Sequence, residues 1–306
     1  MINEVTFVII GRNESQHLPR TFESVKKITD KIIYVDSNSS DNSILIAKNF
    51  GIKKILKVIS NYGTAALSRS KGAAEVKTKY IQFLDGDETI DLMWVEKAVK
   101  KLEENKVIAG VHGFKKVFKK NEQDYFILSD NKDWQPDYLQ GAFLIRRDIY
   151  EKCGGMETRI FGEEERDLYV RVKALGFQFW YIHELMASHY DWKKKNILFY
   201  FFGPSSYSIW IPFFKAIKNL NLKSYIFVYR YLLPPLIIEI ICLLILLLRL
   251  ENFLIIGLLL QVLELAYCIK INRKGYFIIW KVAIFNFFRI LKVYLMKQKV
   301  KVEYIN

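Results

Sequence analysis

Short apolar runs that end in polar residues are the feature that most restricts the fold of this chain. Residues 5–10, 31–35, 52–59 and 80–84 are runs of this kind, rich in β-branched and aromatic side chains. Between them lie stretches in which apolar residues recur at helical spacing. Strands that alternate with helices in this way are typical of a parallel sheet with helices on its faces. We therefore predict an α/β fold for the N-terminal part of the chain.

The run at residues 80–84 leads directly into two acids, Asp85 and Asp87, which are separated only by Gly86. Ligands of open α/β sheets bind just beyond the carboxyl ends of parallel strands, where these acids would lie. A glycine between two carboxylates lets both turn toward one point, and such oxygen ligands suit Mg²⁺ or Mn²⁺. An isolated Asp-Gly-Asp also occurs as a plain solvated turn. The metal-site hypothesis therefore depends on what else lies at this edge of the sheet.

Two more acidic features fall at the ends of predicted elements. Asp36 follows the run at residues 31–35, where an acid is placed to hydrogen-bond the ribose or base of a nucleotide, or else to cap the next helix. Glu163, Glu164 and Glu165 open a predicted helix, and three successive acids exceed what a helix N-terminus requires. The glycine-rich fingerprints of NAD enzymes and P-loop NTPases do not occur in the sequence. We therefore expect a nucleotide site of another kind.

The formal net charge of +14 is unevenly distributed along the chain. Residues 193–306 contain 17 Lys and Arg and only 4 Glu, a net charge of +13, which leaves +1 for residues 1–192. The predicted α/β part is therefore nearly neutral, which argues against a nucleic-acid-binding protein. The basic excess lies in the same third of the chain as the longest apolar runs, and this indicates contact with an anionic membrane surface. The three Cys have no metal-binding or disulfide spacing, as expected for a reducing compartment.

Two apolar stretches, residues 232–248 and 253–269, dominate the C-terminal third. Each has 17 residues; Glu239 interrupts the first, and Gln261 and Glu264 interrupt the second. Because an α-helix rises about 1.5 Å per residue, each stretch falls somewhat short of the hydrocarbon core of about 30 Å. They would span the membrane with the help of flanking residues, form a re-entrant hairpin, or pack as two buried helices of a soluble domain.

Basic residues flank this pair of stretches on both sides, which predicts that both flanks, and with them the α/β part, lie in the cytoplasm. The preceding ones are Lys215, Lys218 and Lys223, and the following ones are Lys270, Arg273 and Lys274. Residues 276–296 are predicted to form an amphipathic helix in the membrane interface, with Lys281, Arg289 and Lys292 on one face. The aromatic-rich segment 196–214 would lie there too, or would form helices that pack on the sheet.

The motifs of the N-terminal part, taken in order, resemble those of the family 2 glycosyltransferases, which have the GT-A fold. The resemblance covers residues 5–192 and is carried by the first strand with Asn13 and Glu14, the loop that begins at Asp36, residues 68–72 with Arg69, the Asp-Gly-Asp segment, and residues 146–168. It implies a Rossmann-like, mixed and mostly parallel sheet flanked by helices over residues 1–195. Residues 196–224 would then be interfacial or linker helices, and residues 225–306 a helical membrane region.

The resemblance also implies a role for each matching residue. The donor nucleotide would be bound by Asn13, Glu14, Asp36, Arg69 and Asp85. Mn²⁺ or Mg²⁺ would be held by Asp85 and Asp87, with His189 at the place where some relatives have a metal-binding histidine. Glu165, just ahead of Arg166, would be the general base, whereas a slip of one residue in the alignment would give this role to Glu164. The Gln-x-x-Arg-Trp signature of processive synthases does not occur in the sequence.

The function that follows from this resemblance is an inverting, metal-dependent, non-processive glycosyltransferase at the cytoplasmic membrane. It would take a sugar from a nucleoside diphosphate sugar, with a UDP-sugar favoured, and transfer it to a hydroxyl group of a lipid-linked or other glycan acceptor. Transfer to a polyprenyl phosphate is one alternative. A non-catalytic membrane protein that binds nucleotide sugars is another.

Overall fold

The computed structural model describes residues 2–61, 63–119, 125–128, 133, 139, 141–160, 164–192, 223, 226, 233–247, 254–270 and 298–305. The chain divides into two compact units. The first contains Met1–Lys194 together with Lys297–Asn306, and the second contains Lys195–Met296. Each unit is described by itself below.

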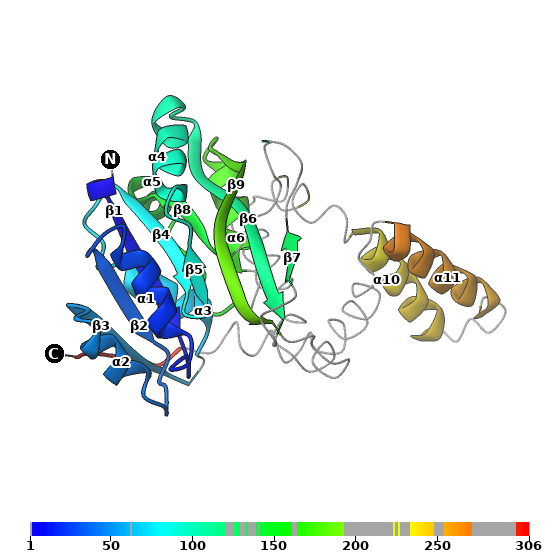
Figure 1. Cartoon of the computed structure of the whole chain (residues 1–306). Helices are drawn as coiled ribbons and strands as arrows, with labels where there is room; N and C mark the ends of the chain where they lie inside the picture. Colours follow the sequence, from blue (N-terminus) through cyan, green and yellow to red (C-terminus); the bar gives the residue numbers. More distant parts are fainter. Residues whose placement is uncertain are drawn as a thin grey trace. The chain divides into compact units, whose positions relative to one another are not determined.

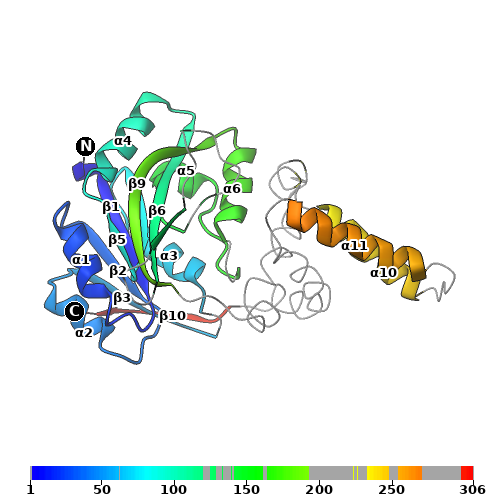
Figure 2. The same ribbon diagram turned by 45° about the vertical axis from the view of Figure 1, so that its right-hand side comes forward.

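A ten-stranded mixed sheet forms the centre of the first unit (Figure 1), in the order β10-β3-β2-β1-β4-β8-β6-β9-β5, with β7 paired to β6. Its strands are β1 (Val5–Gly11), β2 (Ile32–Asp36), β3 (Lys54–Ser60), β4 (Tyr80–Asp85), β5 (Glu88–Ile90), β6 (Ile108–Lys119), β7 (Tyr125–Leu128), β8 (Phe143–Arg146), β9 (Gln178–Trp192) and β10 (Val300–Ile305). Its helices are the 3-10 turn η1 (Ile2–Glu4), α1 (Leu18–Lys26), α2 (Ser43–Asn49), α3 (Ala65–Ala73), α4 (Trp94–Glu104), α5 (Arg147–Lys152) and α6 (Glu164–Ala174). In Figure 2, α1 and α2 lie on one side of the sheet and α3 and α6 on the other.

The four strands β3, β2, β1 and β4 are parallel, as the alternation of strands and helices predicts. Their register places Gly11 beside Asp36 and Ile10 beside Asp85, so the polar ends of β1, β2 and β4 meet at one edge. The strands beyond β4 are mixed, because β8 runs antiparallel to both β4 and β6. The predicted mixed α/β architecture is therefore present.

Close packing of α3 against the sheet depends on Gly72. A Cβ atom at this position would lie 2.4 Å from Cγ1 of Val8 on β1 and 2.9 Å from Cγ2 of Val35 on β2, which no side chain could accommodate without a shift. Since Arg69 is on the same helix, this contact brings its guanidinium group close to the end of β4.

The sequence pattern also predicts strands near residues 107–118, 125–128 and 140–147, where β6, β7 and β8 lie, but it predicts no strand for β5, β9 or β10. β5 is very short and directly follows Asp87, and β9 is long but carries many polar residues. β10 lies in the range assigned to the C-terminal region, 225–306, yet it pairs antiparallel with β3 of the first unit over Val300 to Ile305 (Figure 2). The edge of the sheet is thus covered by residues that follow the apolar stretches in the sequence.

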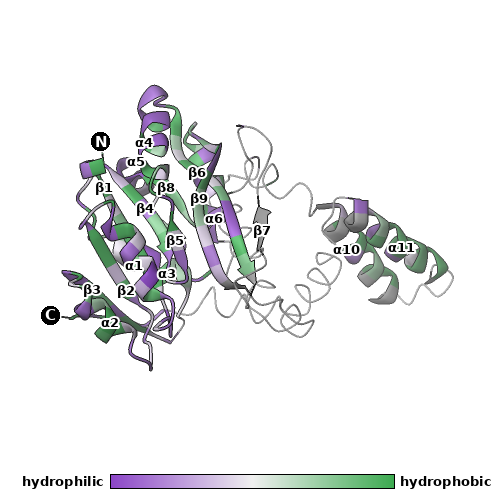
Figure 3. Ribbon diagram, viewed as in Figure 1, coloured by the Kyte–Doolittle hydropathy of each residue, from purple (hydrophilic) through white to green (hydrophobic). Residues whose placement is uncertain are grey.

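In the second unit the structure describes two helices, α10 (Leu233–Leu247) and α11 (Leu254–Lys270), close to the two predicted apolar stretches. Figure 3 shows hydrophobic residues along both helices. In the described parts of the chain, no helix has both the length and the apolar character needed to cross a membrane. The predicted interfacial helix at 276–296 and the aromatic segment 196–214 lie outside the described residues.

Candidate functional site

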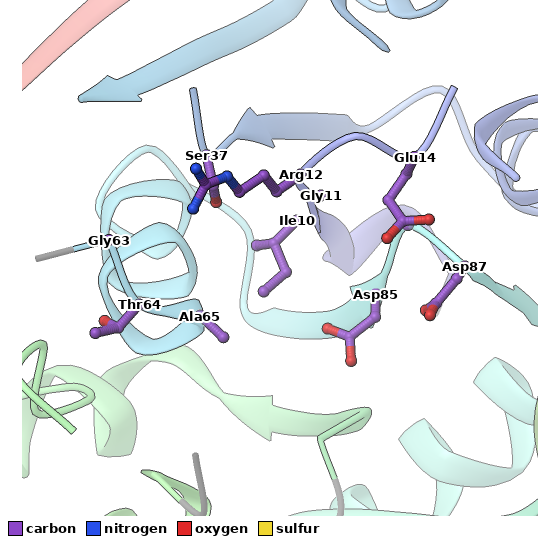
Figure 4. A pocket seen from close by; sticks show the side chains of 11 residues that line it. Ile10, Gly11, Arg12, Glu14, Ser37, Gly63, Thr64, Ala65, Asp85 and Asp87 are labelled. Carbon is purple, nitrogen blue, oxygen red and sulfur yellow. The ribbon is translucent and has the colours of Figure 1, made fainter. Parts of the chain in front are cut away.

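A pocket of about 300 Å³ lies where β1, β2 and β4 end (Figure 4). The loop after β1, the first residue after β2, the N-terminus of α3 and the Asp-Gly-Asp segment form its walls. In Figure 4 the carboxylates of Glu14, Asp85 and Asp87 lie on one side of the pocket, and Arg12 and Thr64 lie on the other. Three of the predicted site residues therefore line one cavity.

Asn13 and Asp36, which were predicted to bind the donor nucleotide, hold the loops around the pocket together. Asn13 adopts a left-handed conformation, with φ +59°, and its side-chain oxygen accepts a hydrogen bond from the backbone N–H of Ser40 at 2.9 Å. Asp36 is fully buried, and its carboxylate accepts hydrogen bonds from the N–H of Ser39 at 2.8 Å and the hydroxyl of Tyr34 at 3.2 Å. The loop after β1 is thus tied to the loop after β2. A contact of Asp36 with a nucleotide base stays a prediction.

Arg69 connects the end of β4 with the start of α6. Its guanidinium group donates to Asp85 at 2.6 Å, to Glu164 at 2.5 Å and to Glu165 at 3.1 Å. The Arg69 side chain is only 3% exposed, and its ion pairs with Glu164 and Glu165 are buried, whereas the Asp85 side chain is 35% exposed. Arg69 lies behind Asp85 rather than among the described residues that line the pocket. The predicted base, at either Glu164 or Glu165, is therefore linked to the predicted metal ligand through one arginine.

The pKa values of the acids that Arg69 contacts differ from one another. Burial and the neighbouring Glu164 raise the pKa of Glu165 to about 8. Burial by itself would also raise the pKa of Asp85, but Arg69 and Lys115 outweigh it, and the pKa lies below its ordinary value. Asp85 is therefore a stable anion, whereas Glu165 can take up and release a proton near neutral pH. Acids whose environments push their pKa values apart are typical of sites in which one holds charge and the other transfers protons.

His189 of β9 lies next to Asp87, with its Nε2 atom 3.0 Å from a carboxylate oxygen. Burial would lower the pKa of His189, but the hydrogen bond and the charge of Asp87 outweigh burial and raise it. On β5, Glu88 lies opposite His189 and forms a buried ion pair with Lys115 of β6. The structure thus places His189 next to Asp87, to which it is hydrogen-bonded.

Some residues at the site were not predicted. Arg12 lines the pocket on the side opposite the Glu14 carboxylate, and its position directly after the first strand is a signal that could have identified it. Thr64 caps α3 by accepting a hydrogen bond from the N–H of Leu67 at 2.9 Å, and it also lines the pocket. Lys115 occupies the middle of a strand, where nothing in the local pattern distinguishes it.

The acids at the pocket fit a metal ion that is shared with a substrate. Within the described ranges, no group of three or more His, Cys, Asp or Glu is arranged to hold a metal ion. Asp85 and Asp87 do line one cavity, and Mg²⁺ is commonly held by one or two carboxylates together with substrate phosphates. The donor set therefore suits Mg²⁺ or Mn²⁺ that arrives with a phosphorylated ligand.

Comparison with known sequences identifies one family. The model of glycosyl transferase family 2 matches residues 6–162. An uncharacterized glycosyltransferase of Rickettsia conorii is 40% identical over 57 residues, which is 19% of this chain and 20% of the relative. A second such protein, of Rickettsia bellii, is 31% identical over 90 residues, 29% of this chain and 30% of the relative. The matched part thus spans less than a third of either relative.

Comparison with solved structures identifies the same kind of fold. GalNAc-T7, solved with UDP, GalNAc and Mn²⁺, aligns with a TM-score of 0.52 at 16% identity, over 61% of this chain and 43% of that chain. Residues 1–349 of TarS from S. aureus, solved in complex with UDP-GlcNAc, align with a TM-score of 0.50 at 12% identity, over 62% of this chain and 59% of that chain. At identities of 16% and 12%, the structural similarity shows that the fold is shared and shows nothing about activity.

Proposed function

The chain belongs to glycosyl transferase family 2, and on this premise we propose that it transfers a sugar from a nucleoside diphosphate sugar to a hydroxyl group. The observation that carries the proposal is the arrangement of acids around Arg69. Asp85 lines the pocket at the end of β4, and the same guanidinium group holds Glu164 and Glu165 at the start of α6. Groups for binding a donor and for removing a proton are thereby joined in one network.

The pocket side of this network suits the donor. Asp85 and Asp87 would hold Mn²⁺ or Mg²⁺, and the metal, when bound, would offset the negative charge of the leaving diphosphate. Arg12, across the pocket from these acids, is placed to contact a phosphate or the nucleotide. A UDP-sugar is favoured as donor, because two proteins that share the fold were solved with UDP or UDP-GlcNAc.

The α6 side of the network suits the acceptor. Glu165 would take the proton of the acceptor hydroxyl while that oxygen forms a bond to the anomeric carbon of the sugar. The bond from this carbon to the diphosphate oxygen breaks at the same time, and the diphosphate leaves with the bonding electrons. Attack from the face opposite to the leaving group inverts the configuration of the sugar. Glu165 is favoured over Glu164 because its side chain is 10% exposed against 3%. The pKa of Glu165, raised to about 8, lets it exchange a proton near neutral pH.

We further propose that the protein works at the cytoplasmic face of a membrane on a lipid-linked glycan acceptor. Support comes from the second unit, where aliphatic side chains of α10 and α11 point outward while Glu239 and Gln261 bond to each other at 3.2 Å. A hairpin that exposes its apolar side chains and pairs its polar ones suits contact with lipid. The basic residues before and after the hairpin favour the cytoplasmic side.

The test is binding of UDP to the full-length chain, measured by titration calorimetry with and without Mn²⁺. In wild type, Mn²⁺ should strengthen binding. In Asp87→Asn this gain should be lost, while thermal stability changes by no more than about 1 kcal/mol, as for other partly exposed polar residues. Glu96→Gln, a change of the same kind on helix α4, is the matched control and should bind as wild type does.

Three outcomes would argue against parts of the proposal. Unchanged UDP affinity of Asp87→Asn in excess Mn²⁺ would remove Asp87 from the metal site. Binding of UDP-sugars without any transfer or hydrolysis would favour a non-catalytic binding protein. Transfer to a polyprenyl phosphate, but not to a glycan hydroxyl, would make the protein a polyprenyl-phosphate sugar transferase.

A further inference from the structure

The strand β10 brings the end of the chain back to the first unit. Its pairing with β3 runs from Val300 opposite Ser60 to Ile305 opposite Ile55. The hydroxyl of Tyr304 also donates to Glu75 at 2.8 Å, and Ile305 packs against the core. Residues 298–305 are therefore a built part of the glycosyltransferase domain, although about a hundred residues of the second unit precede them in the sequence.

Just before β10, Gln298 makes two contacts with Thr158, which lies between α5 and α6. Its side-chain oxygen accepts a hydrogen bond from the Thr158 hydroxyl at 2.8 Å. Its side-chain nitrogen donates to the Thr158 carbonyl at 3.4 Å. The next residue, Lys299, donates its backbone N–H to the side chain of Asn61 at 2.9 Å, at the end of β3. The start of β10 thus contacts two segments of the domain that are distant from each other in the sequence.

Thr158 in turn contacts the wall of the pocket. Its carbonyl accepts a hydrogen bond from the Thr64 hydroxyl at 2.7 Å, and that same hydroxyl oxygen accepts from the N–H of Leu67. Thr64 lines the pocket and caps α3, the helix that carries Arg69. A continuous set of hydrogen bonds therefore joins Gln298 to the pocket wall and to α3. Arg69 of this helix donates hydrogen bonds to Asp85, Glu164 and Glu165.

We propose that Gln298 is a positioning residue for the donor pocket. By fixing Thr158, it fixes the direction of the Thr64 hydroxyl and with it the first turn of α3. The proposal rests on the function proposed above, since it assigns to this pocket the binding of the donor nucleotide. It also means that the end of the chain contributes to donor binding, a role that its position after the second unit does not suggest.

The experiment compares Gln298→Met with Lys299→Met in the full-length chain. Gln298→Met keeps the length of the side chain but loses both hydrogen bonds. Lys299→Met is the matched control, because Lys299 is exposed and contacts Asn61 only through its backbone N–H. Two quantities are measured: the Kd for UDP with Mn²⁺, and the rate of hydrogen exchange at the Leu67 amide in the absence of nucleotide.

For Gln298→Met we expect UDP binding about 3-fold to 10-fold weaker than in wild type, the usual consequence of losing a hydrogen bond. The Leu67 amide should exchange faster by a similar factor, and Lys299→Met should match wild type in both measurements. Thr158→Val, which removes the hydroxyl partner of Gln298, should weaken binding similarly. The double variant should bind no worse than the weaker single one, because both changes break the same contact.

Two results would overturn the proposal. One is wild-type UDP affinity in Gln298→Met; the other is a fall in affinity that disappears once the binding is corrected for the fraction of unfolded protein. Gln298→Glu, which keeps the acceptor for the Thr158 hydroxyl, should recover part of the affinity if positioning is the cause. If wild type itself does not bind UDP, the proposed function fails, and an unchanged Leu67 exchange rate in Gln298→Met would then overturn the positioning role as well.

Discussion

The two units of this chain place their polar and apolar side chains in opposite ways. In the first unit the apolar residues form the core, and the buried polar groups include Arg69 with Glu164 and Glu165. In α10 and α11 of the second unit, aliphatic side chains are outside: Ile255 is 72% and Leu258 is 68% exposed. The polar side chains of Glu239, Gln261 and Cys242 face one another, with contacts of 3.2 and 3.4 Å.

This difference indicates that the two units are adapted to different surroundings. Burial of an ion pair costs free energy unless further contacts compensate, so the cluster around Arg69 is better explained by chemistry than by stability. Exposure of many large aliphatic side chains in one region likewise requires a partner surface. On the function proposed above, the first unit keeps these polar groups inside for a reaction, and the second keeps its apolar groups outside to meet an apolar surrounding. Each of the predictions below tests one side of this comparison.

The largest effect is expected for Glu165→Gln, which tests the chemical role of the buried charges. The amide cannot accept the proton of an acceptor, so transfer should fall by about two to four orders of magnitude, as when a general base is removed. UDP affinity should stay within a few-fold of wild type, because Glu165 does not line the described pocket. The measurement is initial transfer rate beside calorimetric UDP binding.

Glu164→Gln is the control for that variant, since Glu164 binds the same Arg69 atom. It should retain more transfer activity than Glu165→Gln. An active Glu165→Gln and an inactive Glu164→Gln would show that the base is Glu164. Full activity of both would mean that the buried acids only neutralise Arg69.

A smaller effect is expected for Leu258→Lys, which tests the outward apolar face of α11. If this face meets lipid, the change should weaken binding to anionic vesicles by about 10-fold to 100-fold, since an apolar side chain of this size contributes about 1.5–3 kcal/mol on burial. The measurement is flotation with vesicles at high salt, where attraction between charges is screened.

Leu45→Lys is the matched control, because Leu45 is similarly exposed, at 54%, but belongs to α2 of the first unit. It should leave flotation unchanged. If Leu258→Lys also floats as wild type does, the apolar face of α11 does not contact lipid, and the membrane part of the proposal fails.

The part of the fold that can be predicted from the sequence is the part made of local signals. β1 to β4 are apolar runs with polar ends, and the Asp-Gly-Asp segment can be placed because it ends β4. β10 has alternating side chains, but nothing local indicates that its partner is β3, more than two hundred residues earlier. β5 has only three residues, Glu88–Ile90, too few for an alternation of side chains to indicate a strand.

The site shows the same limit. Sequence motifs can identify Asp85, Glu165 and Arg69 as members of one site. They do not show that Arg69 donates hydrogen bonds to all of these acids, because this depends on how α3 and α6 pack. The orientation of a loop acid is likewise set by its hydrogen bonds. Asp36 accepts a hydrogen bond from Ser39 of its own loop, which the motif does not indicate, and its contact with a nucleotide stays a prediction.

The smallest effect is expected for His112, and it tests whether buried ionisable groups make folding of the first unit depend on pH. His112 of β6 is fully buried against Tyr181, and burial, with Lys115 nearby, lowers its pKa to about 3. Between this value and its ordinary pKa of about 6.5, the unfolded chain binds a proton that the folded chain does not, so stability falls as the pH falls. From pH 7 to pH 5.5 this contribution is about 1 kcal/mol. His112→Gln should therefore lose about that much less stability than wild type over the same interval, measured by urea unfolding in detergent. Equal losses in the two proteins would show that His112 takes up its proton without unfolding of the sheet.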